Sequence, residues 1–136
     1  MAQDIKEFRH KTPEFEGPKK TWQVCNSDLM KVQVQVVKDG GENNLHTHTG
    51  EDAFWYVVSG AVRFYGEGDK VIGEYQKGEG VLVPRGFKYW FESASSDTLE
   101  VLRVTAKDQN IDNKRVDLSP QKDWMIQQNT FGARQQ

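Results

Sequence analysis

Alternation of apolar and polar residues with a period of two is the feature that most limits the fold of this chain. Residues 30–38, MKVQVQVVK, place Val32, Val34 and Val36 on one face of an extended segment and Gln33, Gln35 and Val37 on the other. Further short runs rich in β-branched and aromatic residues follow, at residues 54–58, 62–65, 71–75, 81–83, 87–91 and 99–105. Clusters of glycine, proline, serine and acidic residues separate them, which is typical of an all-β sandwich or barrel. The sequence therefore predicts an all-β fold over residues 30–106.

The segments on either side of this region are polar. Residues 1–29 carry mixed charges and two prolines, and we expect an N-terminal arm that packs on the barrel. Residues 107–136 form a polar C-terminal extension, in which Ser119-Pro120, followed by Asp123 and Trp124, is typical of a helix start. A short C-terminal helix or tail is expected. A chain of 136 residues is the usual size of one domain.

Composition excludes several classes of protein. The 4 Trp, 7 Phe and 4 Tyr indicate a folded chain, because disordered segments lack aromatic side chains. A formal net charge of -2 argues against nucleic acid as a partner. No apolar run approaches the roughly 20 residues of a membrane-spanning helix, and we expect a cytoplasmic protein without a membrane partner. Cys25 is the single cysteine, which excludes an internal disulfide and any multi-thiolate metal site.

His46-Thr47-His48 is the first candidate for a functional site. On a strand, alternation sends both imidazoles to the same face, where they could share a divalent transition metal. Two donors hold a metal weakly, so other residues would have to complete the site. The alternative is a pair of surface histidines that form hydrogen bonds.

Two stretches of the chain resemble the paired signatures of the cupin superfamily. Gly40, His46, His48 and Gly60 match the first signature, G-x5-H-x-H-x3–4-E-x6-G. The second signature, G-x5-P-x-G-x2-H-x3-N, resembles the segment of residues 78–93, where Gly78, Pro84 and Gly86 are in register. The resemblance implies a double-stranded β-helix, a small jelly-roll-like barrel of two facing antiparallel sheets with a ligand pocket at its centre.

The resemblance also implies a metal held by two histidines and a glutamate of the first signature and a histidine of the second. This chain departs from the pattern at two positions, because Ala53 stands at the place of the glutamate and Tyr89 at the place of the second-signature histidine. Asp52 fits the shorter spacing of the signature and could complete the site if a β-bulge turned it inward. Glu51 is a second, less favoured choice; otherwise both carboxylates are solvated turn residues.

Tyr89 has three possible roles at the position it shares with the family's histidine. Its phenolate could bind the metal, or its hydroxyl could act as a general acid or a hydrogen-bond donor to a substrate. The third possibility is an aromatic side chain that only fills the space.

Strand alternation also proposes the lining of a substrate pocket. Trp55 shares a face with Ala53 and Val57, and Phe87 and Phe91 share one with Tyr89. Arg103 is in phase with Val101 and Thr105, so its side chain could point inward and pair with an anion. The alternative is an exposed arginine. The same aromatic residues could simply form the core of a small barrel.

The function that we expect is an enzyme in which His46 and His48, completed by Tyr89 or Asp52, hold iron, manganese, nickel or zinc against a small organic substrate. Dioxygenase, isomerase and cyclase chemistry are compatible with such a site. One alternative is a metal-free sugar isomerase or epimerase with a histidine such as His48 as base and Tyr89 as acid, and another is a non-catalytic barrel that binds a small ligand. The resemblance also implies a homodimer that covers exposed sheet faces.

Overall fold

Short strands connected by tight turns make up nearly all of the regular structure. The computed structural model describes residues 4–38, 42–122 and 125. Within them the elements are β1 (Lys19–Asn26), β2 (Met30–Val37), β3 (His46–His48), β4 (Glu51–Ser59), β5 (Ala61–Tyr65), the 3-10 turn η1 (Glu67–Asp69), β6 (Val71–Gln76), β7 (Gly80–Val83), β8 (Trp90–Ser93), β9 (Leu99–Lys107) and β10 (Arg115–Asp117). The all-β expectation is confirmed.

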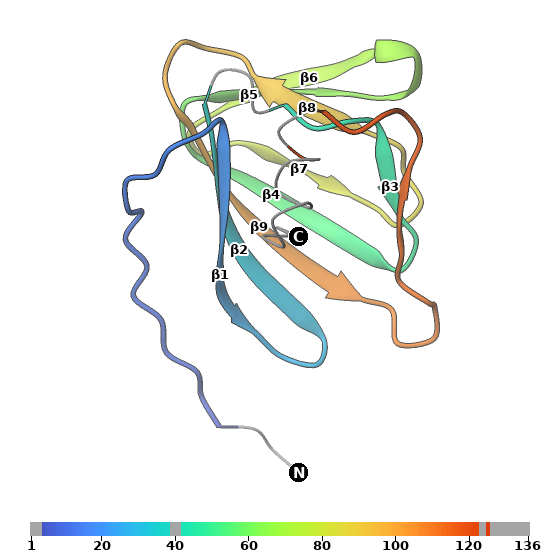
Figure 1. Ribbon diagram of the computed structural model, residues 1–136. Helices are drawn as coiled ribbons and strands as arrows, with labels where there is room; N and C mark the ends of the chain where they lie inside the picture. The colour runs from blue at the N-terminus through green and yellow to red at the C-terminus, as the bar shows by residue number, and fades with distance from the viewer. Residues whose placement is uncertain (1–3, 39–41, 123–124, 126–136) are drawn as a thin grey trace.

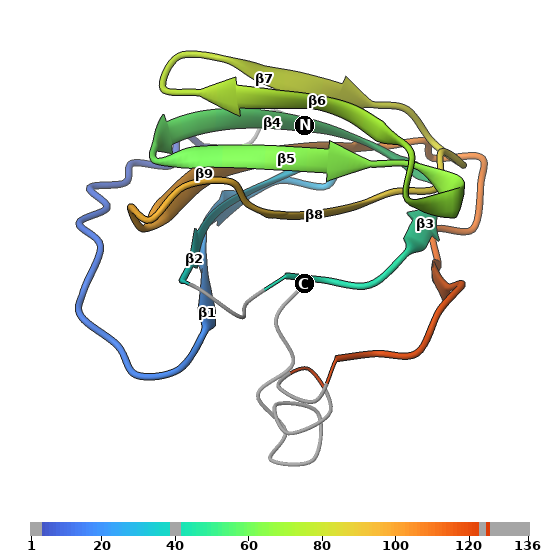
Figure 2. The same ribbon diagram turned by 90° about the horizontal axis from the view of Figure 1, so that it is seen from above.

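Two antiparallel sheets face each other (Figures 1 and 2). One has five strands in the order β1-β2-β9-β4-β7, and the other has three strands in the order β6-β5-β8. A two-stranded pair, β10-β3, lies at one end of the sandwich, where Arg115 pairs with His48 and Asp117 with His46. This end of the molecule carries the histidine pair.

The core fills the space between the sheets, and β4 shows how the sequence places it there. Ala53, Trp55 and Val57 are buried, whereas Phe54 and Tyr56 between them are exposed, as period-two alternation predicts. The indole of Trp55 packs against Phe64 and Phe91 of the other sheet, with ring centroids 5.9 and 5.0 Å apart. These aromatic contacts join the two sheets. The cluster comprises Val37, Ala53, Trp55, Val57, Val62, Phe64, Val83, Tyr89, Phe91, Leu99 and Val101.

The corner between β4 and β5 depends on Gly60. This residue has a φ of +76°, in the left-handed region, and a Cβ there would lie 2.7 Å from the carbonyl oxygen of Thr98. Only glycine avoids both the backbone strain and the steric overlap. The hairpin can therefore pass directly from one sheet to the other.

The flanking segments differ from the sequence prediction. Residues 1–29 are expected to form an arm, but residues 19–26 form β1, which pairs with β2 along its length. In the C-terminal extension, residues 115–117 form β10. Residues 119–122 are not helical, although the sequence predicts a helix start at Ser119-Pro120, and most of the residues after them lie outside the described part of the chain. Among the residues that are described, no helix has the length and apolar character that a membrane crossing requires.

The chain before β1 lies against the outer face of the five-stranded sheet. The hydroxyl of Thr12 donates to Glu100 at 2.9 Å, and the ring of Phe15 meets that of Trp22 edge to face at 5.5 Å. The ammonium of Lys38 donates to the carbonyl oxygen of Phe15 at 2.9 Å. These contacts cover part of the apolar face of β1 and β2.

Candidate functional site

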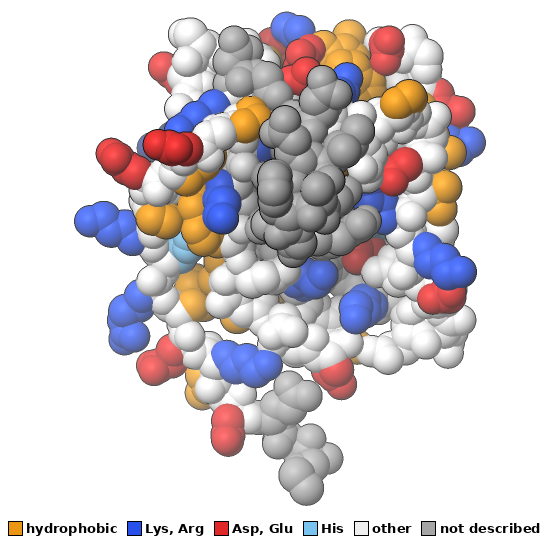
Figure 3. Space-filling view, viewed as in Figure 1, with side chains coloured by type: hydrophobic (Ala, Val, Ile, Leu, Met, Phe, Trp, Pro, Cys, Tyr) orange, Lys and Arg blue, Asp and Glu red, His pale blue; other side chains and the backbone are white. Residues whose placement is uncertain are grey.

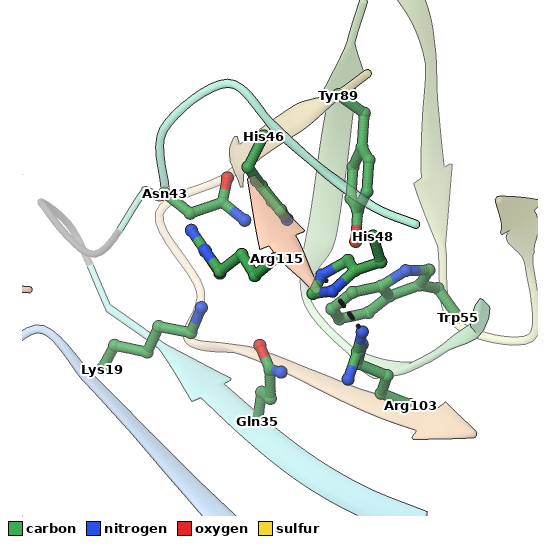
Figure 4. Close-up of a pocket in the computed structure, with 9 residues that line it drawn as sticks. All are labelled: Lys19, Gln35, Asn43, His46, His48, Trp55, Tyr89, Arg103 and Arg115. Atoms are coloured by element: carbon green, nitrogen blue, oxygen red, sulfur yellow. Dashed lines mark hydrogen bonds between the residues drawn. The ribbon is translucent and has the colours of Figure 1, made fainter. Parts of the chain in front are cut away.

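A pocket opens between the sheets at the end of the sandwich that carries β3 (Figure 4). Its cavity volume is about 30 Å³, which is space for about two water molecules with the side chains as they lie, and it is partly open to solvent. Its residues come from both ends of the chain as well as from the barrel. They are Lys19, Gln35, Asn43, His46, His48, Trp55, Tyr89, Arg103 and Arg115.

The two histidines of β3 both line this pocket. Their ring centroids lie 5.1 Å apart, and the backbone of His46 exchanges two hydrogen bonds with that of Tyr89, at 3.1 and 3.0 Å. The Nδ1 of His46 lies 2.7 Å from the carbonyl oxygen of Asn44. Because a carbonyl oxygen only accepts, Nδ1 carries the proton and Nε2 is left with its lone pair.

Both imidazoles are neutral at pH 7. Burial lowers the pKa of His46 well below its ordinary value, and the charge of Arg115 adds to this effect. Burial and the charge of Arg103 lower the pKa of His48 to about 4, although Glu51 acts in the opposite direction. The pair therefore offers lone pairs rather than positive charge.

Arg103 occupies the space beside His48. Its Nη2 donates to the Oε2 of Glu51 at 2.7 Å and lies 3.5 Å from the Nε2 of His48 (Figure 4), and its Nη1 donates to Gln33 at 3.3 Å. Arg103 and Glu51 are both buried, at 4% and 6% exposure. The guanidinium of Arg103 therefore lies where a metal ion would have to bind to contact both His48 and Glu51.

The structure brings Glu51 toward the pocket and leaves Asp52 outside it, which corrects the preference for Asp52. Pairing of β4 with β9 is regular from Glu51 to Val57, so no bulge turns Asp52 inward. Asp52 instead accepts a hydrogen bond from the backbone of Arg85 at 2.9 Å. Burial would raise the pKa of Glu51, but the charge of Arg103 and a hydrogen bond from Asn113 lower it.

Lys19 and Arg115 belong to the pocket, although the sequence analysis places both in polar extensions. Lys19 lies on the inner face of β1 opposite Val37, and Arg115 lies on β10 opposite His48. The guanidinium of Arg115 donates to Asn44 at 2.7 Å and to Asp117 at 3.0 Å. With Arg103, the pocket gathers three basic side chains.

One buried donor and one buried acceptor of the pocket residues have no acceptor or donor among the described residues. They are the hydroxyl of Tyr89 and the side-chain oxygen of Gln35. The indole N–H of Trp55 lies beside the oxygen of Tyr89. Burial raises the pKa of Tyr89, against the charges of Arg103 and Arg115, so its hydroxyl keeps its proton. Such unpaired buried groups are costly unless a ligand or water satisfies them.

The remaining aromatic candidates lie away from the pocket. Phe91 is fully buried in the core, and Phe87 precedes β8 and is 43% exposed, beside a separate apolar hollow with Leu82 and Pro84. Phe87 therefore does not share the inward face of Tyr89. The reason is that the regular strand begins only at Trp90, so alternation does not extend back to residue 87.

Comparison with known proteins identifies the family. The family model for the cupin domain matches residues 33–105, which is more than half of the chain. The chain belongs to the cupin family. A search of curated proteins found no match.

Solved structures similar to this cupin share its fold at low sequence identity. An uncharacterized conserved protein with a double-stranded β-helix domain from Klebsiella pneumoniae has a TM-score of 0.65 and 17% identity, covering 77% of this chain and 90% of its own. KdgF from a Halomonas species has a TM-score of 0.60 and 20% identity, covering 74% and 91%. A variant of the oxalate decarboxylase OxdC from Bacillus subtilis has a TM-score of 0.60 and 20% identity, covering 79% of this chain and 30% of its own.

The donors of this cupin do not fit the metal that members of its family often bind. No group of three histidine, cysteine or acidic side chains converges among the described residues. Ala53 is buried where the signature has its glutamate, and Glu51 is already bound to Arg103 and Asn113. A divalent ion at His46 and His48 would also lie beside the positive charge of Arg103.

Proposed function

We propose that this cupin binds a small organic anion, such as a carboxylate, in the pocket beside β3 and does so without a metal ion. The observation that carries the proposal is the gathering of Lys19, Arg103 and Arg115 around one pocket. Glu51 offsets the charge of Arg103, and Asp117 offsets that of Arg115. A ligand carboxylate would be a further acceptor for the N–H groups of the two guanidiniums.

The hydrogen-bonding groups of the pocket support an oxygen-rich ligand. The hydroxyl of Tyr89 is a buried donor that has no acceptor among the described residues, and an anionic oxygen would accept its hydrogen bond. The Nε2 of His46 and the side-chain oxygen of Gln35 would accept from a ligand hydroxyl. Together these groups suit a small hydroxy or oxo acid.

Proton transfer is a second candidate function, and the position of Tyr89 favours it. The rings of His46 and Tyr89 lie 4.6 Å apart, and at pH 7 His46 is unprotonated and Tyr89 is protonated. The lowered pKa makes His46 a weaker base than an ordinary histidine, and the raised pKa makes Tyr89 a weaker acid than an ordinary tyrosine. One solved cupin of the same fold is an oxalate decarboxylase by its description, so chemistry on a carboxylate occurs on this scaffold. If the protein is an enzyme, we expect a metal-independent isomerase in which His46 and Tyr89 transfer protons.

Calorimetric titration with malonate tests the proposal. The wild type should bind this small dicarboxylate, and Arg115→Gln should bind it at least about tenfold more weakly, because a hydrogen bond to a charged group contributes roughly 1.5–3 kcal/mol. Arg63→Gln, at an arginine paired with Glu74 on the three-stranded sheet, is the matched control and should bind as the wild type does.

Metal dependence is tested in the same experiment. Protein purified without a chelating tag should keep its malonate affinity in the presence of EDTA. If EDTA abolished binding and iron, manganese, nickel or zinc restored it, the protein would be the metal-dependent cupin expected from the histidine pair. Equal affinity of the wild type and Arg115→Gln would also reject the anion site as placed here.

A further inference from the structure

Lys19 brings a primary amine into the pocket, and a primary amine can form a covalent bond as well as bind an anion. It lies on the inner face of β1, opposite Val37, and its side chain reaches toward Arg115 and Gln35 (Figure 4). Its Nζ lies 5.0 Å from the centre of the Phe91 ring, in the fully buried core. The side chain of Lys19 lines the pocket, so a ligand bound there would lie beside it.

The surroundings of Lys19 favour an uncharged amine. Burial, and then the positive charges of Arg115 and Arg103, lower the pKa of Lys19 to about 7. An amine with such a pKa is a nucleophile near neutral pH, in contrast to an exposed lysine. The two guanidiniums that produce this effect are also the groups that would hold a carboxylate beside it.

We propose that Lys19 condenses with the carbonyl carbon of a small 2-oxo carboxylate bound in this pocket and forms an imine. The inference rests on the proposed anion site, because Arg103 and Arg115 hold the carboxylate next to the amine. The nitrogen lone pair attacks the carbonyl carbon, and one amine proton passes to the carbonyl oxygen to give a hydroxyl group. The second amine proton passes to this hydroxyl group, which departs as water and leaves the C=N bond. Two hydrogens and one oxygen leave as that water, and no oxidant or reductant is needed.

Reductive trapping with pyruvate tests the proposal on the intact protein. Pyruvate and sodium cyanoborohydride should add the mass of one reduced pyruvate per chain, and peptide mapping should place it on Lys19. Lys20 is the internal control, because it follows on the same strand, faces the opposite side of the sheet and is also partly exposed. Labelling of Lys20 equal to that of Lys19 would overturn the proposal.

Variants and a competitor separate this proposal from the anion site itself. Lys19→Arg should lose the adduct, because a guanidinium does not condense with a ketone, and Lys20→Arg should keep both the adduct and malonate binding. Malonate has no ketone and should protect Lys19 from labelling in the wild type. If malonate binds and Lys19 is not labelled, the imine is rejected and the anion site stands. If Lys19 is labelled but malonate neither binds nor protects it, the carboxylate-guided reaction proposed here is rejected together with the anion site.

Discussion

Individual buried charges determine how this protein should respond to pH. His46 and His48 are neutral in the folded protein because burial and neighbouring cations lower their pKa, whereas in the unfolded chain they take up protons near pH 6.5. Between pH 6.5 and about 4, the unfolded state therefore binds more protons than the folded state. Folding stability must fall as the pH falls through this window.

We expect the free energy of unfolding in urea to decrease between pH 7 and pH 5 by up to about 1.4 kcal/mol per pH unit for each of these histidines. His48→Gln removes one of them and should reduce the decrease by about half. His10→Gln, at a histidine outside the pocket, is the control for the loss of an imidazole. A decrease of the same size in His48→Gln and the wild type would contradict the assigned environment of His48.

The sequence predicts some of these residues and misleads about others. Alternation correctly indicates that Trp55 faces inward. It leaves Arg103 either inward or exposed, and the structure buries it. The same alternation from Ala53 back to Glu51 indicates the buried carboxylate, but the signature spacing favours Asp52, which lies on the opposite face. Parity is the better guide here because the pairing of β4 with β9 stays regular at that position.

At the scale of elements, the contribution of Gly60 to the corner between β4 and β5 can be measured against a second glycine, Gly86. Gly86 has a φ of +80°, close to the +76° of Gly60, but a Cβ at Gly86 would meet no atom within 4 Å. Gly60→Ala should therefore cost more than Gly86→Ala, because it adds overlap with the Thr98 carbonyl to the same backbone strain. We expect a difference of about 1–3 kcal/mol in the free energy of unfolding. Equal losses in the two variants would show that the hairpin corner relaxes freely.

Two strands of the site could not be recognised from the sequence. The segment of β1, KKTWQVCN, follows a charged stretch, and β10 has three residues, RVD, within a polar extension. Both are stabilised by pairing with a neighbouring strand rather than by an apolar pattern of their own. The only signal of their role is the polar inner face of β2, where Gln33 and Gln35 interrupt an otherwise apolar strand.

At the scale of the whole molecule, the outer face of the five-stranded sheet is unusually apolar. Strand pairing lines up Leu82 with Phe54, Phe54 with Val104, and Val104 with Val32 across four strands. Leu82 is 66% exposed and Phe54 is 45% exposed. Elsewhere, on the face shown in Figure 3, basic and acidic side chains are interspersed among the described residues.

We propose that a second copy of the chain covers this sheet face, as the expected homodimer requires. A flat apolar face can pack on its own copy across a two-fold axis. Light scattering at micromolar concentration should give the mass of a dimer for the wild type and of a monomer for Leu82→Glu. Val71→Glu, at a residue 55% exposed on β6 of the other sheet, is the control and should remain dimeric. A monomeric wild type would exclude the dimer.

The three basic side chains of the pocket come from different parts of the chain. Arg103 lies within the segment that matches the cupin family model, residues 33–105, whereas Lys19 and Arg115 lie before and after it. Two of the three basic side chains of the pocket therefore lie on strands outside the segment that matches the family model. If the proposed anion site holds, we expect that exchange of β1 and β10 between related cupins changes the ligand that this site accepts.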